Sequence, residues 1–231
     1  MYVTSAFAAL VYASNIRYAE SATNYLAESA DSDPFLHTWS LAVEEQFYMF
    51  WPLLLFLVVR DCPPVQIRKR LATTLIVAGF LSLLLSIYLT FHNQPWAFFN
   101  PFTRVWEFAL GALAYLGGLT DNRRRTSELL QWLGLFALTS AACSFDNYTR
   151  FPGFAAVIPT LGIFAILISS VKAAQSVVTR VLESPAMRLC GELSYAWYLW
   201  HWPVFVLARS IFGAESIASR VMLIGLSFAL A

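Results

Sequence analysis

Charged residues are scarce in this sequence. Lys, Arg, Asp and Glu make up 13% of the 231 residues, whereas 58% are hydrophobic and 16% are aromatic. Soluble domains average about 25% charged residues. Together with a mean hydropathy of +0.60, this composition excludes an ordinary water-soluble globule. The formal net charge of +1 gives no indication of nucleic-acid binding.

Cysteine is also rare. Cys62, Cys143 and Cys190 are odd in number, lie far apart and form no C-x-x-C pair. This pattern excludes a disulfide framework and has no zinc-ligand spacing, so we predict no metal site. We interpret the three side chains as buried small apolar groups. No basic segment precedes the apolar run over residues 1–13, so we do not expect this run to be a secretory signal.

Long apolar stretches fill most of the chain, separated by charged or Pro/Gly-rich breaks. A helix needs about 20 residues to cross a bilayer. We therefore predict an all-α, polytopic transmembrane helix bundle of about eight helical segments. The first and last segments stop short of a span, so we expect a fragment that is incomplete at both ends. The predicted segments cover residues 1–14, 44–59, 71–91, 103–119, 128–144, 154–171, 190–209 and 218–231.

The distribution of basic residues predicts an orientation. Successive loops must alternate between the two sides of a membrane, and Lys and Arg accumulate on the cytoplasmic side. Loops 60–70, 120–128 and 172–189 are rich in these residues, so we expect them to be cytoplasmic. The long loop 15–43 carries several acidic residues and is expected to face outward.

The densest polar cluster is H-T-W-S-L-A-V-E-E-Q-F-Y, residues 37–48, which runs from the outward loop into an apolar helix. If helix begins near His37, then His37, Ser40 and Glu44 share one face and Glu45 points away. We predict that these four residues form a catalytic or acceptor site, with Glu44 beside His37. Alternatively, Glu45 and Glu44 interact only with the positive end of the helix dipole.

Two further polar clusters lie within apolar segments. Arg104 and Glu107 are three residues apart and can pair on one helix face, either as a structural clamp or as a binding site for an anionic group. Tyr198 and His201 are also three apart and precede Pro203, which frees a backbone carbonyl for another partner. We predict that these clusters line a polar path or bind substrate. The aromatic residues around His201 also fit an interfacial belt.

These three motifs resemble the integral-membrane acyltransferases of family three, the O-antigen and Nod-factor acylating enzymes. The first block is H-T-W-S-L-A-V-E-E-Q-F-Y followed by Trp51 and Pro52. The second, residues 104–111, resembles the family's R-x-W-E-F-x-x-G helix, and residues 194–203 resemble its S-Y-x-x-Y-L-W-H-W-P helix. The resemblance spans nearly the whole chain and implies a single acyltransferase-like transmembrane domain over residues 1–231.

The resemblance implies transfer of an acyl group, usually acetyl, from cytoplasmic acyl-CoA to a hydroxyl of a carbohydrate or lipid-linked glycan. It also implies a location in the bacterial inner membrane, with membrane lipid as a partner. In our hypothesis His37 and Glu44 organise the acceptor end, while Arg104 and His201 contribute to a polar path or to donor contacts. Family members carry an upstream arginine motif and a histidine base that precede Met1, so we expect this chain to be inactive alone.

Two other functions use the same buried polar residues. A transporter would bind a solute with them, but transporters often contain internal repeats, and the two halves of this chain show none. A non-catalytic membrane partner would need no complete set of catalytic groups.

Overall fold

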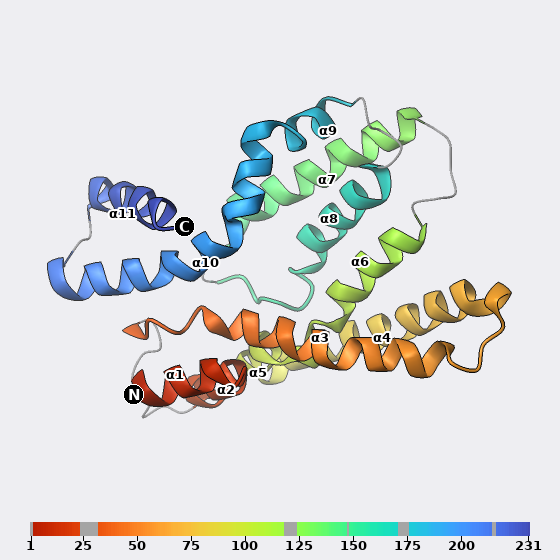
Figure 1. Ribbon diagram of the computed structural model, residues 1–231, viewed down its shortest axis with the longest axis horizontal. Helices are drawn as coiled ribbons and strands as arrows, with labels where there is room; N and C mark the ends of the chain where they lie inside the picture. Colours follow the sequence, from red (N-terminus) through yellow and green to blue (C-terminus); the bar gives the residue numbers. More distant parts are fainter. Residues whose placement is uncertain (1, 24–31, 118–123, 147, 171–175, 214–215) are drawn as a thin grey trace. The chain divides into compact units, whose positions relative to one another are not determined.

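The computed structural model describes residues 2–23, 32–117, 124–146, 148–170, 176–213 and 216–231. Every regular element within these ranges is a helix (Figure 1), which confirms the predicted all-α class. The described residues form two compact units, each treated by itself below. Residues 1–46 and 183–231 make up the first unit and residues 47–182 the second. The single domain predicted over residues 1–231 stays a prediction.

The first unit contains α1 (Tyr2–Leu10), α2 (Ser14–Thr23), the start of α3 (Thr38–Val59), α10 (Pro185–Phe212) and α11 (Ile217–Ala229). The ends of α10 follow from its sequence. Ser184 caps the N-terminus by accepting from the Met187 N–H, Pro185 occupies the first turn, and Gly213 closes the helix in the left-handed conformation. The Trp197 Nε1–H donates to Ser227 Oγ at 3.0 Å and ties α10 to α11.

The second unit contains the rest of α3, α4 (Pro64–His92), α5 (Gln94–Phe99), the 3-10 turn η2 (Pro101–Thr103), α6 (Val105–Gly117), α7 (Arg124–Ser144), α8 (Val157–Ser170) and α9 (Val177–Leu182). α7 packs along α8, and α4 packs along α6. Both contacts use glycine. A Cβ on Gly134 of α7 would lie 2.5 Å from the Gly162 carbonyl oxygen of α8, and one on Gly79 of α4 would lie 3.3 Å from the Ala109 Cβ.

The eight predicted segments all correspond to helices, but their boundaries differ. The first predicted segment ends early, because α1 stops at Leu10 and Tyr12 adopts a positive φ of 53° before α2 begins. Three short helices, α2, α5 and α9, were not predicted. α2 is too polar to read as an apolar segment, and α5 and α9 are six residues each, shorter than a periodic pattern can define.

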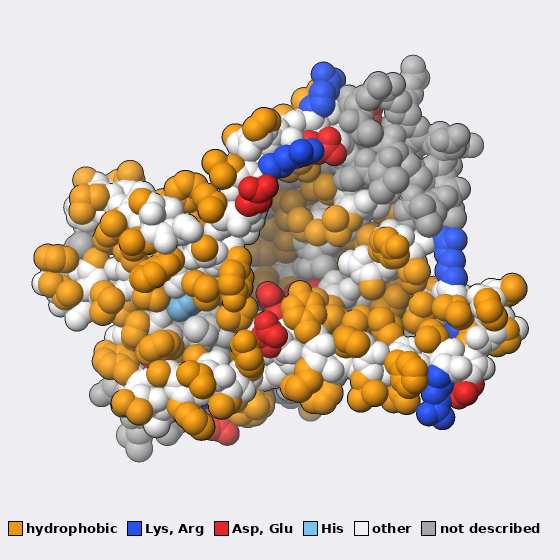
Figure 2. Space-filling model, in the orientation of Figure 1, with side chains coloured by type: hydrophobic (Ala, Val, Ile, Leu, Met, Phe, Trp, Pro, Cys, Tyr) orange, Lys and Arg blue, Asp and Glu red, His pale blue; other side chains and the backbone are white. Residues whose placement is uncertain are grey.

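Two helices in the described residues are long and apolar enough to cross a membrane: α3, with 22 residues, and α4, with 29. Large apolar side chains are exposed along both, including Phe50 and Phe56 on α3 and Phe80 on α4. Figure 2 shows apolar side chains covering much of the visible surface. Such a surface is stable against lipid tails and unfavourable in water.

The cysteine prediction was wrong in part. All three cysteines are free, but Cys143 and Cys190 are exposed and Cys62 is only partly covered. An apolar side chain on the lipid-facing surface of a membrane protein needs no burial within the protein. Parts of the loops used to predict the orientation, including Glu28, Arg123 and Lys172, lie outside the described residues.

Candidate active site

In the first unit, the start of α3 is joined to α10 by hydrogen bonds of the Tyr198 hydroxyl. Its oxygen lies 2.5 Å from Ser40 Oγ, and it also donates to the His37 backbone carbonyl. A carbonyl oxygen can only accept, so the single Tyr198 proton is used there. Ser40 must then donate its own proton to the Tyr198 oxygen. The hydrogen-bonding direction is therefore fixed along this chain of three groups.

His201 lies on α10 beside this chain, and its tautomer follows from one contact. Its Nδ1 is 2.6 Å from the Tyr198 backbone carbonyl oxygen. Because the carbonyl can only accept, Nδ1 carries the proton, and in the neutral ring Nε2 carries the lone pair. No hydrogen bond to Nε2 is present in the described part of the chain. His201 therefore presents a basic nitrogen.

His37 packs against the same groups but is buried. Its ring centroid lies 5.5 Å from that of Tyr198 and 5.8 Å from that of His201. Burial, and then repulsion by a charged His201, lower the pKa of His37 to about 4, although the carbonyls of Pro34 and Leu199 favour the protonated ring. His37 is consequently neutral near pH 7.

The sequence predicts that Pro203 frees a backbone carbonyl for another partner, and the Leu199 carbonyl near His37 is that group. Proline has no N–H, so Pro203 cannot supply the usual helical partner four residues back, at Leu199. That carbonyl instead lies close enough to the His37 ring to affect its pKa. The predicted free carbonyl is thus part of the cluster.

Asp33 and Trp202 belong to the same cluster but were not among the predicted site residues. Asp33 is completely buried, and its carboxylate accepts from Ser5 Oγ at 2.5 Å and from the Phe35 N–H at 2.9 Å. Its backbone carbonyl accepts from Trp202 Nε1 at 2.8 Å. The sequence places Asp33 four residues before His37, and this spacing was the available signal for it. The spacing does not indicate that Asp33 is buried.

Glu44 and Glu45 make no hydrogen bond to these groups in the described residues, although Glu44 interacts electrostatically with Tyr198. α3 begins at Thr38, one residue after the helix start near His37 that the predicted shared face requires. Glu44 is exposed and Glu45 partly exposed, and in the described residues neither makes a hydrogen bond or an ion pair. Their catalytic role stays a prediction.

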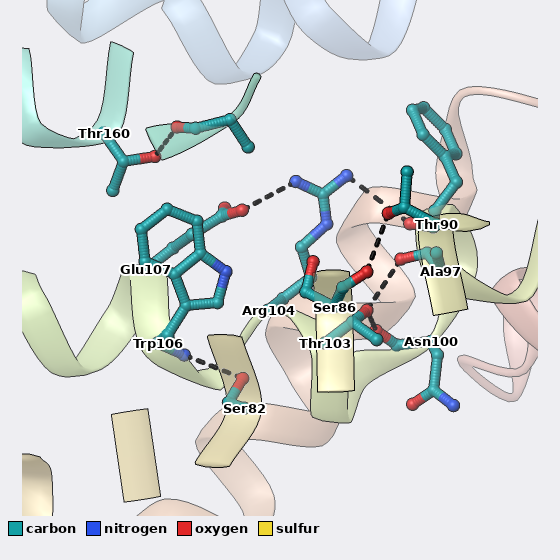
Figure 3. A network of polar contacts seen from close by, with 12 residues as sticks. Ser82, Ser86, Thr90, Ala97, Asn100, Thr103, Arg104, Trp106, Glu107 and Thr160 are labelled. Atoms are coloured by element: carbon teal, nitrogen blue, oxygen red, sulfur yellow. Dashed lines mark hydrogen bonds and ion pairs between the residues drawn. The ribbon is translucent and has the colours of Figure 1, made fainter. Parts of the chain in front are cut away.

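The second unit contains the predicted Arg104–Glu107 pair (Figure 3). Arg104 Nη1 lies 2.9 Å from Glu107 Oε1, which confirms that the two residues meet. Arg104 precedes α6 and ends η2, and its Nη2 donates to the Phe98 carbonyl at 3.4 Å. The guanidinium also lies over the rings of Phe98 and Phe151, 5.5 and 5.7 Å from their centroids.

Three buried polar residues of α4, Ser82, Ser86 and Thr90, lie near this pair (Figure 3). Ser82 accepts from the Trp106 N–H at 3.1 Å (Figure 3). It also donates to the Phe102 carbonyl at 2.6 Å and so joins α4 to the start of α6. Ser86 Oγ and Trp106 Nε1 are buried without a hydrogen-bond partner among the described residues. Of the two predicted roles of the Arg104–Glu107 pair, these hydrogen bonds and aromatic contacts favour the structural clamp, and a part in substrate binding stays a prediction.

No group of three or more His, Cys, Asp or Glu side chains that could hold a metal ion occurs in the part of the chain that the structure describes. The groups gathered around His201 are imidazole, phenol and hydroxyl. They are suited to hydrogen bonding and proton transfer.

Comparison with known proteins identifies the family. The chain belongs to the acyltransferase family whose model, described as "Acyltransferase domain", matches residues 2–231. This match confirms the resemblance found in the three sequence motifs. The family transfers acyl groups other than amino-acyl groups, and its members are membrane proteins.

Three relatives illustrate the match. A putative membrane-bound transacylase, BcsY, of Komagataeibacter xylinus is 29% identical over 201 residues, covering 87% of this chain and 49% of the relative. The O-acetyltransferase OatA of Staphylococcus aureus is 28% identical, with coverage of 95% and 37%. The putative peptidoglycan O-acetyltransferase YrhL of Bacillus subtilis is 29% identical, with coverage of 89% and 34%.

The chain spans half or less of the length of these relatives. No solved structure matches it.

Proposed function

We propose that this chain is the transmembrane acyl-transfer domain of an O-acyltransferase. In this proposal the donor is acyl-CoA, with acetyl as the acyl group, and the acceptor is a hydroxyl of a cell-surface carbohydrate or lipid-linked glycan. The observation that carries it is the His201 tautomer, because a base with a free lone pair is what a hydroxyl acceptor requires. Relatives named as O-acetyltransferases support the same chemistry.

The transfer needs one proton acceptor, and in our proposal His201 takes this role instead of the upstream histidine that the family resemblance implies. His201 Nε2 removes the proton of the acceptor hydroxyl as its oxygen attacks the thioester carbonyl carbon. The carbon–sulfur bond then breaks, and the His201 imidazolium gives its Nε2 proton to the departing CoA thiolate. This leaves an ester on the carbohydrate, free CoA and a neutral imidazole, so atoms and charge balance.

Ser40 is a poor candidate for a covalent acyl carrier. A serine nucleophile gives its proton to an adjacent base, whereas the Ser40 proton is directed to the Tyr198 oxygen. A phenol oxygen is a far weaker base than an imidazole. Direct transfer between donor and acceptor, without an acyl-serine, therefore suits this geometry better.

The proposed location is the bacterial inner membrane. Loops 60–70, 120–128 and 172–189 would face cytoplasmic acyl-CoA, and loop 15–43 would face the outer side, where a glycan acceptor is found. Tyr198 and His201 in the first unit, and Arg104 and Glu107 in the second, remain candidates for residues that bind substrate or line a polar path.

Acetyl transfer by His201→Gln in the full-length protein tests the proposal. Glutamine keeps much of the size and can still donate to the Tyr198 carbonyl, but it cannot accept a proton at neutral pH. We expect kcat for transfer from labelled acetyl-CoA to fall by roughly 10²- to 10⁴-fold, the usual contribution of a general base. Unchanged transfer by a correctly inserted variant would remove His201 as the base.

A further inference from the structure

The segment that carries His37 is attached to α10 at two points. The Trp202 Nε1–H donates to the Asp33 carbonyl at 2.8 Å, and the Tyr198 hydroxyl donates to the His37 carbonyl. The two acceptors are four residues apart, and so are the two donors. Donors at i and i+4 lie one above the other on a helix face. α10 therefore holds the Asp33–His37 segment in an antiparallel register.

The Asp33 side chain attaches the same segment to α1. Its buried carboxylate accepts from Ser5 on α1, and Ser5 Oγ accepts in turn from Arg17 Nε on α2 at 3.0 Å. Asp33 also accepts from the Phe35 N–H, and its own carbonyl accepts from the Leu36 N–H at 3.1 Å. The segment is thus a closed turn, anchored to α1 by the Asp33 side chain and to α10 by the Asp33 and His37 carbonyls.

His201 lies between the two donors in the sequence of α10. Any movement of the Asp33–His37 turn along α10 changes the contact between the His37 and His201 rings, whose centroids are 5.8 Å apart. It also changes the burial on which the neutral state of His37 depends. The Trp202 indole therefore contacts Asp33 and acts on His201 only through the position of the turn.

We infer that Asp33 and Trp202 are positioning residues for the acyl transfer: together they hold the His37 turn against His201, so that the histidine pair is packed correctly for reaction. The inference rests on the proposed function, because it names what aligns the proposed base. Asp33 and Trp202 themselves touch no reacting atom. Errors in alignment of about 1 Å can reduce turnover by roughly a hundredfold.

α10 provides a matched control for Trp202. Trp197 lies five residues earlier, and its Nε1–H also donates one hydrogen bond, to Ser227 Oγ at 3.0 Å. Trp197→Phe and Trp202→Phe therefore each remove one indole hydrogen bond from the same helix. Only Trp202→Phe releases the Asp33–His37 turn.

The experiment combines a titration with a rate measurement in the full-length protein. This chain has three histidines, and a single His→Gln variant at each of them identifies its ¹⁵N signals in the spectrum of the full-length protein. The Tyr198 and His201 rings of α10 pack against His37, and the electrostatic effect of His201 contributes to the His37 pKa. The histidine signals of each variant are therefore followed over the full pH range.

For Trp202→Phe we expect the His37 titration to move up from about 4 towards the ordinary value of 6.5, because a loosened turn admits water. We also expect kcat to fall by roughly tenfold to a hundredfold with little change in KM for acyl-CoA. Trp197→Phe should change neither. Asp33→Ala, which detaches the turn from Ser5, should move the titration in the same direction as Trp202→Phe.

The positioning role is overturned if both Trp202→Phe and Asp33→Ala leave the His37 titration in place, or if Trp197→Phe moves it as much as Trp202→Phe. Far-UV circular dichroism of each variant confirms that the helices have formed. The titration is independent of turnover. A wild-type protein that transfers no acyl group would therefore refute the proposed function while leaving the turn's attachment to be judged by the spectra.

Discussion

The closest approach of α7 and α8 gives a quantitative test of the packing in the second unit. A Cβ placed on Gly134 would lie 2.5 Å from the Gly162 carbonyl oxygen and 2.8 Å from Ile166 Cγ1. The first of these is a backbone atom that no rotamer change can move. Because carbon–oxygen contacts are normally about 3.3 Å or longer, Gly134→Ala forces the helices apart by roughly 0.8 Å.

The expected effect is the difference between two opposing terms. Overpacking a well-packed contact costs about 1–3 kcal/mol, and replacing a helical glycine by alanine returns about 0.5–1 kcal/mol. The difference spans about 0 to 2.5 kcal/mol, so we expect Gly134→Ala to lower the free energy of unfolding by roughly 1 kcal/mol. Gly162→Ala should behave alike, since its Cβ would lie 2.8 Å from the Gly134 carbonyl oxygen.

Gly111 on α6 is the control, because a Cβ there would meet no atom within 4 Å. Gly111→Ala should introduce no steric overlap, and alanine is favoured over glycine in a helix. We therefore expect the free energy of unfolding to rise by about 0.5–1 kcal/mol. Thermal unfolding in detergent micelles, followed by circular dichroism, measures all three variants. If Gly134→Ala were as stable as Gly111→Ala, the close α7–α8 contact would be wrong.

The remaining predictions concern the site. Ser40→Ala should retain acetyl transfer to within about tenfold, since it loses one hydrogen bond; a loss of more than a thousandfold in kcat would indicate a covalent acyl-serine. The free energy of unfolding should fall by up to roughly 3 kcal/mol as pH drops from about 6.5 to 4, because the unfolded chain protonates His37 whereas the folded protein holds its pKa near 4. Denaturant titrations over this pH range should show the fall in the free energy of unfolding with decreasing pH. His37→Gln should abolish this pH dependence. For the Arg104–Glu107 pair, each partner replaced alone by an apolar residue should destabilise the second unit by about 3–5 kcal/mol, and the double replacement by much less. Additive effects in that double-mutant cycle would contradict a structural clamp.

The fold class could be predicted because membrane helices are specified by composition. Long apolar stretches such as α3 and α4 admit only one structure in lipid, since backbone groups must be satisfied within the segment. Helix ends depend on local contacts that hydropathy does not register. The positive φ of Tyr12, for example, separates α1 from α2 inside an apolar run.

Part of the site could be predicted in the same way. Polar residues three or four apart on one helix must lie close together, and both the Arg104–Glu107 contact and the Tyr198–His201 contact were found. Pairings between distant segments were not accessible. The contact between Ser40 and Tyr198 joins residues 158 positions apart, and its proton directions follow only from knowing which atoms meet.

The burial of polar groups was the least predictable feature. Asp33 and Glu44 are both acidic residues within a short distance of His37 in the sequence. Asp33 is buried and hydrogen-bonded, whereas Glu44 is exposed. The difference depends on α1, whose Ser5 supplies the partner that makes burial of Asp33 favourable.

The central claim is acyl transfer from CoA to a carbohydrate hydroxyl, and reconstitution tests it most directly. The full-length protein is placed in lipid vesicles with labelled acetyl-CoA on the side of loop 60–70 and a glycan acceptor on the opposite side. Our account predicts a labelled ester on the glycan, with release of free CoA, and its loss in His201→Gln. Passage of the glycan or acceptor sugar through the membrane with no dependence on acetyl-CoA would contradict it and indicate a transporter.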